Sequence, residues 1–131
     1  MTRAPIRRPA GLVCLTLLGV MAPGCGAASG GEPRYVVPGG DPVRGRAAIR
    51  RAGCGACHVV PGVREAEGTV GPPLVAWGRR TYIAGEVPNT PDQLIRWIRT
   101  PQEIEPGTAM PDLGIGDREA RDIAAYLYTI R

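Results

Sequence analysis

Residues 54–58 read Cys54-Gly55-Ala56-Cys57-His58, and this short run decides how the rest of the chain is interpreted. The C-x-x-C-H pattern is typical of the covalent attachment of a c-type haem. In such a site each cysteine sulfur forms a thioether with one vinyl group of the porphyrin, and the histidine supplies an axial nitrogen to the iron. Cys54 and Cys57 are therefore predicted to hold a haem, and His58 to ligate its iron.

The second axial ligand can be sought by elimination. His58 is the only histidine in the chain, so a site with two histidine ligands from one chain is impossible. Of the three methionines, Met1 and Met21 lie in an N-terminal segment that is expected to be removed, which leaves Met110. Met110 follows the Pro106-Gly107 turn in a loop, so we predict an axial ligand rather than core filling. A histidine–methionine pair favours ferrous iron and raises the reduction potential.

Three other kinds of site could use the same cysteines. A zinc site needs about four ligands, and Cys54, Cys57 and His58 supply only three. A thioredoxin-like redox pair usually accompanies a βαβ pattern, which this sequence lacks. A structural disulfide would leave His58 and Met110 without a role. We therefore favour haem first, then a disulfide or redox pair, and zinc last.

The N-terminus has the pattern of an export signal. Residues 1–9 carry three arginines and no acid, and residues 10–22 are apolar but too short to span a bilayer comfortably. We expect residues 1–24 to be a signal peptide, and the protein to be periplasmic or on the outer face of the cytoplasmic membrane. Gly24-Cys25 resembles a lipoprotein processing site, so lipidation of Cys25 would add a membrane tether. The alternative is ordinary cleavage nearby, which leaves a free thiol.

The net charge gives no sign of a basic surface that would bind nucleic acid. The formal charge of +4 arises from 16 basic residues, all arginine, against 12 acidic ones. Removal of residues 1–24 takes away three arginines and leaves +1, and two haem propionates would bring the total close to −1. A basic domain of the kind that binds nucleic acid is therefore not expected.

The folded domain is expected to span residues 41–131. The preceding residues 25–40 are rich in Gly and Pro and are expected to form a flexible tether. Tyr35–Val37 could pack on the domain, but loose attachment is the favoured expectation. The first helix begins with Asp41 as N-cap and Pro42 at the first position, and it ends near Gly53. Because residues 54–58 follow directly, this helix brings the chain to the haem.

Two more helices and one long irregular segment complete the predicted domain. The second helix begins at the N-cap Thr90, where Gln93 is placed to close a capping box, and ends before Pro101. The third has Asp117 as N-cap and runs to the end of the chain. Residues 59–89 show no sustained period, which suits a segment that wraps a cofactor. The prediction is an all-α domain, with three main helices and long loops around a covalent haem.

Residues 41–131 resemble class I c-type cytochromes. That family implies the cytochrome c fold, one covalently bound haem c and single-electron transfer. The resemblance covers most of the chain and follows the family's order of motifs: Cys54-x-x-Cys57-His58, Gly71-Pro72-Pro73-Leu74, Asn89, Trp97, Pro106-Gly107-Thr108-x-Met110-Pro111 and Ala125-Tyr126-Leu127.

The resemblance also implies roles for residues outside the haem motif. The carbonyl of Pro72 would accept a hydrogen bond from the His58 ring and so fix its orientation. Arg79 corresponds to the family's propionate-binding arginine, and its neighbour Arg80 could substitute. Trp97 would pack near the methionine ligand.

Two finer resemblances concern the first helix and the subfamily. Gly45 and Ile49 are similar to the first-helix residues that cross the last helix near Ile123 and Tyr126. Residues 89–102 are most similar to cytochrome domains associated with subunit II of haem–copper oxidases. The chain has no further histidine or suitable cysteine for a copper centre, which implies a free-standing or tethered electron donor.

These observations lead to one main functional expectation and two alternatives. We expect an electron carrier, not an enzyme on its own, that takes electrons from a donor such as a quinol-oxidising complex towards a terminal oxidase. The near-neutral charge predicts docking through an apolar rim, with only mild salt dependence. The alternatives are a haem relay subunit of a larger dehydrogenase, and an open-site gas-binding or peroxidase haem protein.

Overall fold

The computed structural model describes residues 35–131, and the account below concerns this part of the chain. The predicted signal peptide and Cys25 lie outside the described residues. Within residues 35–131, no helix has both the length and the apolar character needed to cross a membrane.

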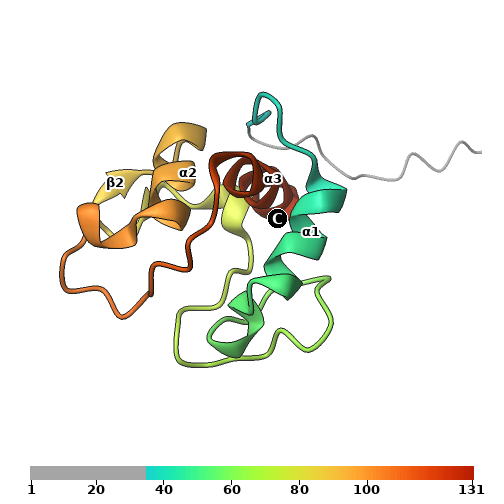
Figure 1. Ribbon diagram of the computed structural model, residues 1–131, viewed down its shortest axis with the longest axis horizontal. Coiled ribbons are helices and arrows are strands. Elements are labelled where there is room, and N and C mark those ends of the chain that lie inside the picture. The colour runs from blue at the N-terminus through green and yellow to red at the C-terminus, as the bar shows by residue number, and fades with distance from the viewer. Residues whose placement is uncertain (1–34) are drawn as a thin grey trace, which may run out of the picture. The chain divides into compact units, whose positions relative to one another are not determined.

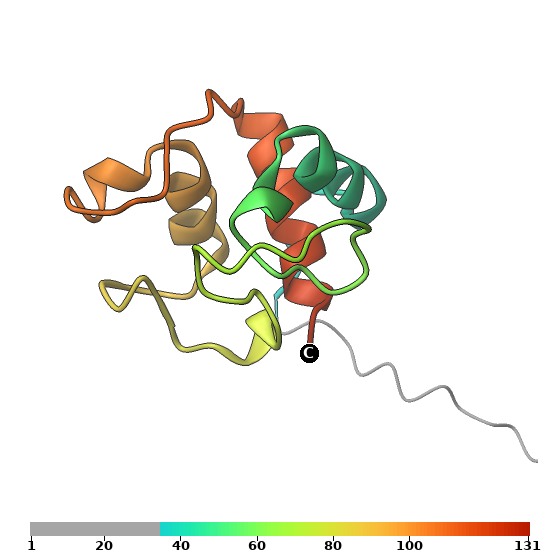
Figure 2. The same cartoon turned by 90° about the horizontal axis from the view of Figure 1, so that it is seen from below.

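Three helices carry the fold, as the sequence predicted: α1 (Pro42–Arg51), α2 (Pro91–Arg99) and α3 (Asp117–Thr129). Figures 1 and 2 show α3 between α1 and α2. The 3₁₀ turns η1 (Cys54–Ala56), η2 (Trp77–Arg79) and η3 (Pro101–Glu103) lie in the loops. One small addition to the predicted all-α architecture is a hairpin, in which β1 (Tyr82–Ile83) pairs antiparallel with β2 (Val87–Pro88). Ala84 and Gly85 form its turn with φ values of 54° and 85°.

The contact between α1 and α3 depends on a glycine. A β-carbon at Gly45 would lie 1.9 Å from the carbonyl oxygen of Asp122 and 3.0 Å from the nitrogen of Ile123. The two backbones therefore approach more closely than any side chain at position 45 would allow, as the resemblance implied. The Asp122 carboxylate reinforces the crossing, because it accepts two 2.8 Å hydrogen bonds from the Arg44 guanidinium and one from the Asp41 N–H.

The predicted start of α1 is confirmed. The carboxylate of Asp41 accepts hydrogen bonds from the backbone N–H groups of Val43 and Arg44, at 2.8 and 3.1 Å. Pro42 occupies the first helical position, where its missing N–H leaves no donor unpaired. Beyond the C-cap Ala52, Gly53 adopts a left-handed conformation with φ of 71° and turns the chain towards η1.

The predicted N-cap and first residue of α2 are confirmed but its capping bonds are absent, and α3 begins one residue earlier than predicted. Thr90 is the N-cap of α2 but its side chain makes no capping hydrogen bond, and the buried Gln93 Oε1 has no partner among the described residues, so the capping box is absent. The N-cap of α3 is Gly116, one residue before the predicted Asp117. The Asp117 carboxylate instead accepts hydrogen bonds from Arg121 and Arg99, which draws it away from the helix end.

The packed part of the chain begins earlier than the sequence suggested. Val37 is only 4% exposed and belongs to the core, and the ring of Tyr35 lies edge-on to Tyr128 with centroids 5.2 Å apart. Loose attachment was therefore the wrong expectation for Tyr35 and Val37, whereas Val36 is 80% exposed. A turn closed by the hydrogen bond from the Gly40 N–H to the Val37 carbonyl brings this segment onto α3.

Candidate haem-binding site

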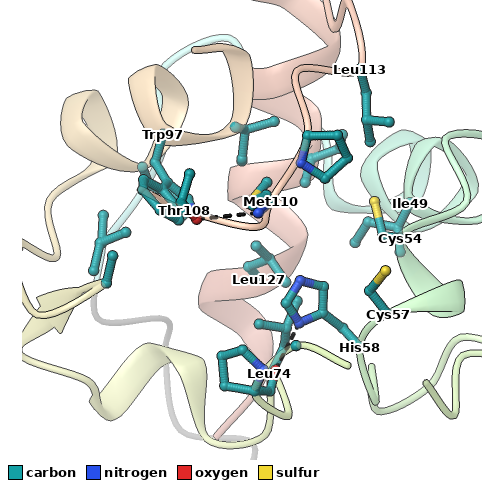
Figure 3. A pocket seen from close by; sticks show the side chains of 18 of the residues that line it. Ile49, Cys54, Cys57, His58, Leu74, Trp97, Thr108, Met110, Leu113 and Leu127 are labelled. Carbon is teal, nitrogen blue, oxygen red and sulfur yellow. Dashed lines mark hydrogen bonds between the residues drawn. The ribbon is translucent and has the colours of Figure 1, made fainter. Parts of the chain in front are cut away.

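A cavity of about 600 Å³ lies among all three helices, η1, η2 and the loops around them. Its lining is predominantly apolar and includes Ile49, Leu94, Ile123 and Leu127 from the helices. Figure 3 shows the labelled side chains that line this cavity. Of the seven residues that the sequence assigned to haem, six line the cavity: Cys54, Cys57, His58, Pro72, Trp97 and Met110. Arg79 does not.

The local fold of residues 53–58 brings the two thiols and the imidazole to one side. The η1 turn is held by hydrogen bonds from the N–H groups of Cys57 and His58 to the Cys54 carbonyl, at 3.3 and 3.0 Å. Both cysteines are free thiols, and burial raises the pKa of the Cys54 thiol. Figure 3 shows the Cys54 and Cys57 side chains on the same side of the cavity, with Cys57 the nearer of the two to His58. This arrangement suits two covalent bonds to one planar group above the histidine.

The position of the His58 ring is set by the two residues Gly71 and Pro72. Nδ1 of His58 lies 2.7 Å from the carbonyl oxygen of Pro72, the contact that the resemblance implied. A proton on Nδ1 donates to that carbonyl and leaves the lone pair of Nε2 free for a metal. Gly71 lies so close to the ring that a β-carbon would clash with it, and its N–H donates to the Cys57 carbonyl at 2.8 Å.

Met110 is presented to the cavity by a loop whose backbone is fixed on both sides. Its N–H donates to Thr108 Oγ1 at 3.2 Å, which Figure 3 shows, and its carbonyl accepts from Gln102 Nε2 at 2.8 Å. Because these bonds occupy the backbone groups, the half-buried thioether is left to reach the cavity. Trp97, from α2, lines the same cavity. The cavity wall thus offers one nitrogen and one soft sulfur that could serve as axial ligands.

Arg80, rather than Arg79, lies at the cavity. The Arg79 side chain is exposed and outside the lining, whereas Arg80 is half-buried within it. The Arg80 guanidinium donates to the carbonyls of Pro73 and Val75, and its carbon lies 5.0 Å from the centroid of the Trp77 ring. Burial lowers the pKa of Arg80. Of the two arginines that the resemblance offered, the structure thus places Arg80 at the cavity and Arg79 outside its lining.

Trp77 provides an independent test of whether the site fits a haem. Its indole Nε1 is buried and has no hydrogen-bond acceptor among the described residues, although Trp77 lines the cavity. A buried N–H without an acceptor costs about 1–3 kcal/mol, so the site calls for an acceptor from outside the described residues. A haem carboxylate would supply one beside the Arg80 cation. The apolar lining, the paired thiols, the two axial donors and this unpaired N–H all fit a c-type haem.

The contacts of Trp77 and of Gly71 were not predicted from the sequence. Trp77 directly precedes Gly78 and the two arginines at positions 79 and 80, so an aromatic residue beside a cationic pair was the available signal. Gly71 belongs to one of the family motifs, but its contact with the ring of a residue 13 positions earlier was not predicted.

Comparison with known proteins agrees with the fold and with the cavity. The family model for cytochrome c matches residues 42–131. The chain is also 35% identical over 91 residues to cytochrome c oxidase subunit 2 of Alkalihalophilus pseudofirmus, which covers 67% of this chain and 25% of that protein. The chain therefore spans about a quarter of the length of this relative. Fold, cavity and sequence together show that the chain belongs to the cytochrome c family, whose members carry haem and transfer electrons.

Proposed function

We propose that this protein is a single-electron carrier with one haem c, attached through Cys54 and Cys57 and ligated by His58 and Met110. The observation that carries the proposal is the convergence of these four side chains on one apolar cavity. Pro72 and Trp97 support the two axial ligands, and Arg80 takes the propionate-binding role that the resemblance gave to Arg79.

The bound haem would supply an iron that alternates between the ferric and ferrous states by one electron. The chain's own residues hold and tune that group. The thiols of Cys54 and Cys57 would hold the porphyrin, the carbonyl of Pro72 orients the His58 ring, and the thioether of Met110 would supply a second ligand to the iron. If His58 and Met110 both ligate the iron, no open position would be left for a substrate, and this favours electron transfer over catalysis.

We further propose that the carrier is exported and passes electrons to a terminal oxidase. The oxidase acceptor is supported by the name of the relative, an oxidase subunit, and by the similarity of residues 89–102 to such domains. The upstream donor would be a quinol-oxidising complex, and Cys25, if lipidated, would tether the protein to the membrane. Residues 1–24 would serve as the signal peptide.

Docking to either partner would use the apolar rim of the cavity. Val70, Tyr82 and Leu113 line the cavity and are also exposed, Val70 by 80%. A rim of this kind binds mainly through apolar burial, so its contribution changes little with ionic strength. This supports the mild salt dependence expected from the net charge.

Mass spectrometry of the mature protein from membrane and periplasmic fractions tests the cofactor, the cleavage site and the lipid together. The expected mass is that of a processed chain plus one haem, and a mature mass without haem would contradict the proposal. Carbon monoxide added to the reduced protein tests the axial ligands. A site closed by Met110 resists the gas, and ready binding would favour an open-site haem protein.

The partner surface is tested by oxidation of the reduced protein with oxidase-containing membranes. We expect Val70→Ser to slow oxidation several-fold, because it removes apolar area at the rim. Val43→Ser is the matched control, since Val43 is 79% exposed but lies on α1 outside the cavity lining. Equal effects of both substitutions, or a steep fall in rate with rising salt, would count against docking at this rim.

A further inference from the structure

We propose that Asn89 and Tyr128 form a buried support that holds residues 77–80 at the wall of the haem cavity and thereby sets the reduction potential. Neither residue lines the cavity, so both are positioning residues that act through Trp77 and Arg80. The inference rests on the proposed function, in which Trp77 and Arg80 would bind the carboxylates of a haem.

The support consists of three hydrogen bonds that use all the polar groups of one amide. The Tyr128 hydroxyl donates to Asn89 Oδ1 at 2.9 Å. Asn89 Nδ2 donates to the carbonyls of Trp77 and Arg80, at 3.2 and 3.1 Å. Asn89 is 2% exposed and Tyr128 is completely buried. One carboxamide therefore binds both ends of the η2 turn and connects them to α3.

The same turn is held to the end of α3 by its backbone. The N–H of Gly78 donates to the Ile130 carbonyl at 2.9 Å, and a β-carbon at Gly78 would lie 3.0 Å from the Tyr128 carbonyl oxygen. The Asn89 N–H in turn donates to the Thr81 carbonyl at 2.8 Å. Residues 77–81 are thus attached to α3 and to the hairpin at several points.

The choice of a polar residue at position 89 is informative. An aliphatic side chain of similar volume would satisfy the packing of a buried site without the cost of desolvating an amide. Buried polar networks that are fully paired instead fix one local geometry. The geometry fixed here is that of the Trp77 indole and the Arg80 guanidinium, the groups that place an N–H and a positive charge beside the cavity.

Those two groups are expected to influence the iron electrostatically. A positive charge held near the haem stabilises the ferrous state relative to the more positively charged ferric state, and hydrogen bonding around the cofactor also tunes its potential. If the support is weakened, Arg80 moves or becomes better solvated and its effect falls. The expected consequence is a lower reduction potential with the axial ligands unchanged.

Tyr128→Phe is the decisive variant, because it removes one buried hydroxyl and keeps the ring. We expect it to lower the equilibrium constant for reduction about threefold, which is roughly 28 mV for a one-electron couple. Tyr126→Phe is the matched control. Tyr126 lies on the same helix and donates one hydroxyl hydrogen bond, but to the Pro61 carbonyl at 2.7 Å and not to Asn89. The control is expected to lose stability without a change in potential.

Dependence on Arg80 is tested with Arg80→Gln alone and combined with Tyr128→Phe. If Tyr128 acts through Arg80 as well as Trp77, the double variant shows a smaller shift than the sum of the two single shifts. Additive shifts would overturn the inference, as would equal shifts in Tyr128→Phe and Tyr126→Phe or an unchanged potential in Tyr128→Phe.

The experiment separates this inference from the function on which it rests. Haem content and the absorption spectrum are measured first on the same samples. Loaded protein with a normal spectrum but an unchanged Tyr128→Phe potential overturns only the role of Asn89 and Tyr128. Protein that carries no haem overturns the proposed function as well.

Discussion

Gly71 lies directly against the imidazole ring of His58. A β-carbon at position 71 would lie 2.3 Å from Cε1 and 2.7 Å from Nδ1 of that ring. The next residue, Pro72, faces Nδ1 with its carbonyl oxygen at 2.7 Å. Two adjacent residues therefore set the ring, one through the absence of a side chain and the other through a hydrogen bond.

Gly71→Ala is expected to displace the His58 ring and break its bond to the Pro72 carbonyl. Loss of such an orienting bond commonly costs tenfold or more in metal affinity or activity. We expect weaker axial ligation, seen as an altered absorption spectrum and a lower haem content per chain. Gly116→Ala is the control, because a β-carbon there meets no atom within 4 Å. A normal spectrum and full haem content in Gly71→Ala would show that the ring tolerates the contact.

Met110→Leu is expected to open the second axial position. The exchange conserves volume, so the packing cost should stay below about 1.5 kcal/mol while the sulfur ligand is lost. We expect the reduced protein to bind carbon monoxide and the reduction potential to fall, because the soft ligand that favours ferrous iron is gone. Leu113→Ala, on the same loop, should leave carbon monoxide excluded. If Met110→Leu also excludes the gas, Met110 is not the ligand.

The parts of the site that could be predicted from the sequence are those fixed by local chemistry. Cys54, Cys57 and His58 are adjacent in the chain, and Met110 was selected because the chain offers few possible ligands. The structure places all four at one cavity. The start of α1 was also predictable, because Asp41 caps the helix with its own side chain.

The parts that could not be predicted depend on partners distant in the chain. Asp117 reads as an N-cap, yet Arg99 and Arg121 take up its carboxylate. Val37 reads as part of a Gly- and Pro-rich tether, yet it is buried in the core. Which of Arg79 and Arg80 reaches the cavity depends on the conformation of η2. That turn is held by Asn89, which lies nine residues after Arg80 in the chain.

Arg79 and Arg80 form a matched pair for testing the propionate contact. Arg80→Gln is expected to lower the equilibrium constant for reduction by about threefold to tenfold, roughly 30–60 mV for one electron, because a cation at the cavity is lost. Arg79→Gln removes the same charge from an exposed position outside the lining and should change the potential much less. Redox titration of both variants decides the assignment, and a larger shift in Arg79→Gln would restore the arginine that the resemblance indicated.

Gly45→Ala gives a test in which the sign of the stability change is decisive. In an open helix this exchange stabilises by about 1 kcal/mol. Here the new β-carbon would lie 1.9 Å from the Asp122 carbonyl oxygen, so α1 and α3 must separate. We expect a loss of about 1–3 kcal/mol in the free energy of unfolding, measured by urea denaturation. Ala47→Gly, also on α1, reports the propensity effect alone, and a gain in stability for Gly45→Ala would disprove the close contact.

The pair of Asp122 and Arg44 should make the stability of the domain depend on pH. The pKa of Asp122 is lowered chiefly by its hydrogen bond from Arg44, and further by the bond from the Asp41 N–H. A carboxyl with a pKa lower in the folded state than in the unfolded state stabilises the fold at pH values above its unfolded pKa of about 4. That contribution disappears as the pH falls from about 4 through the folded-state value.

Asp122→Asn should therefore be less stable than the parent protein at neutral pH and should lose less stability on acidification. Chemical denaturation of both proteins at several pH values between neutral and about 3 measures the two slopes. Asp117→Asn is the control, because the pKa of Asp117 is also lowered, chiefly by Arg121, but this carboxylate is exposed. Its effect should be smaller, since exposed ion pairs contribute little. Parallel pH curves for Asp122→Asn and the parent protein would show that the Arg44 pair does not stabilise the crossing of α1 and α3.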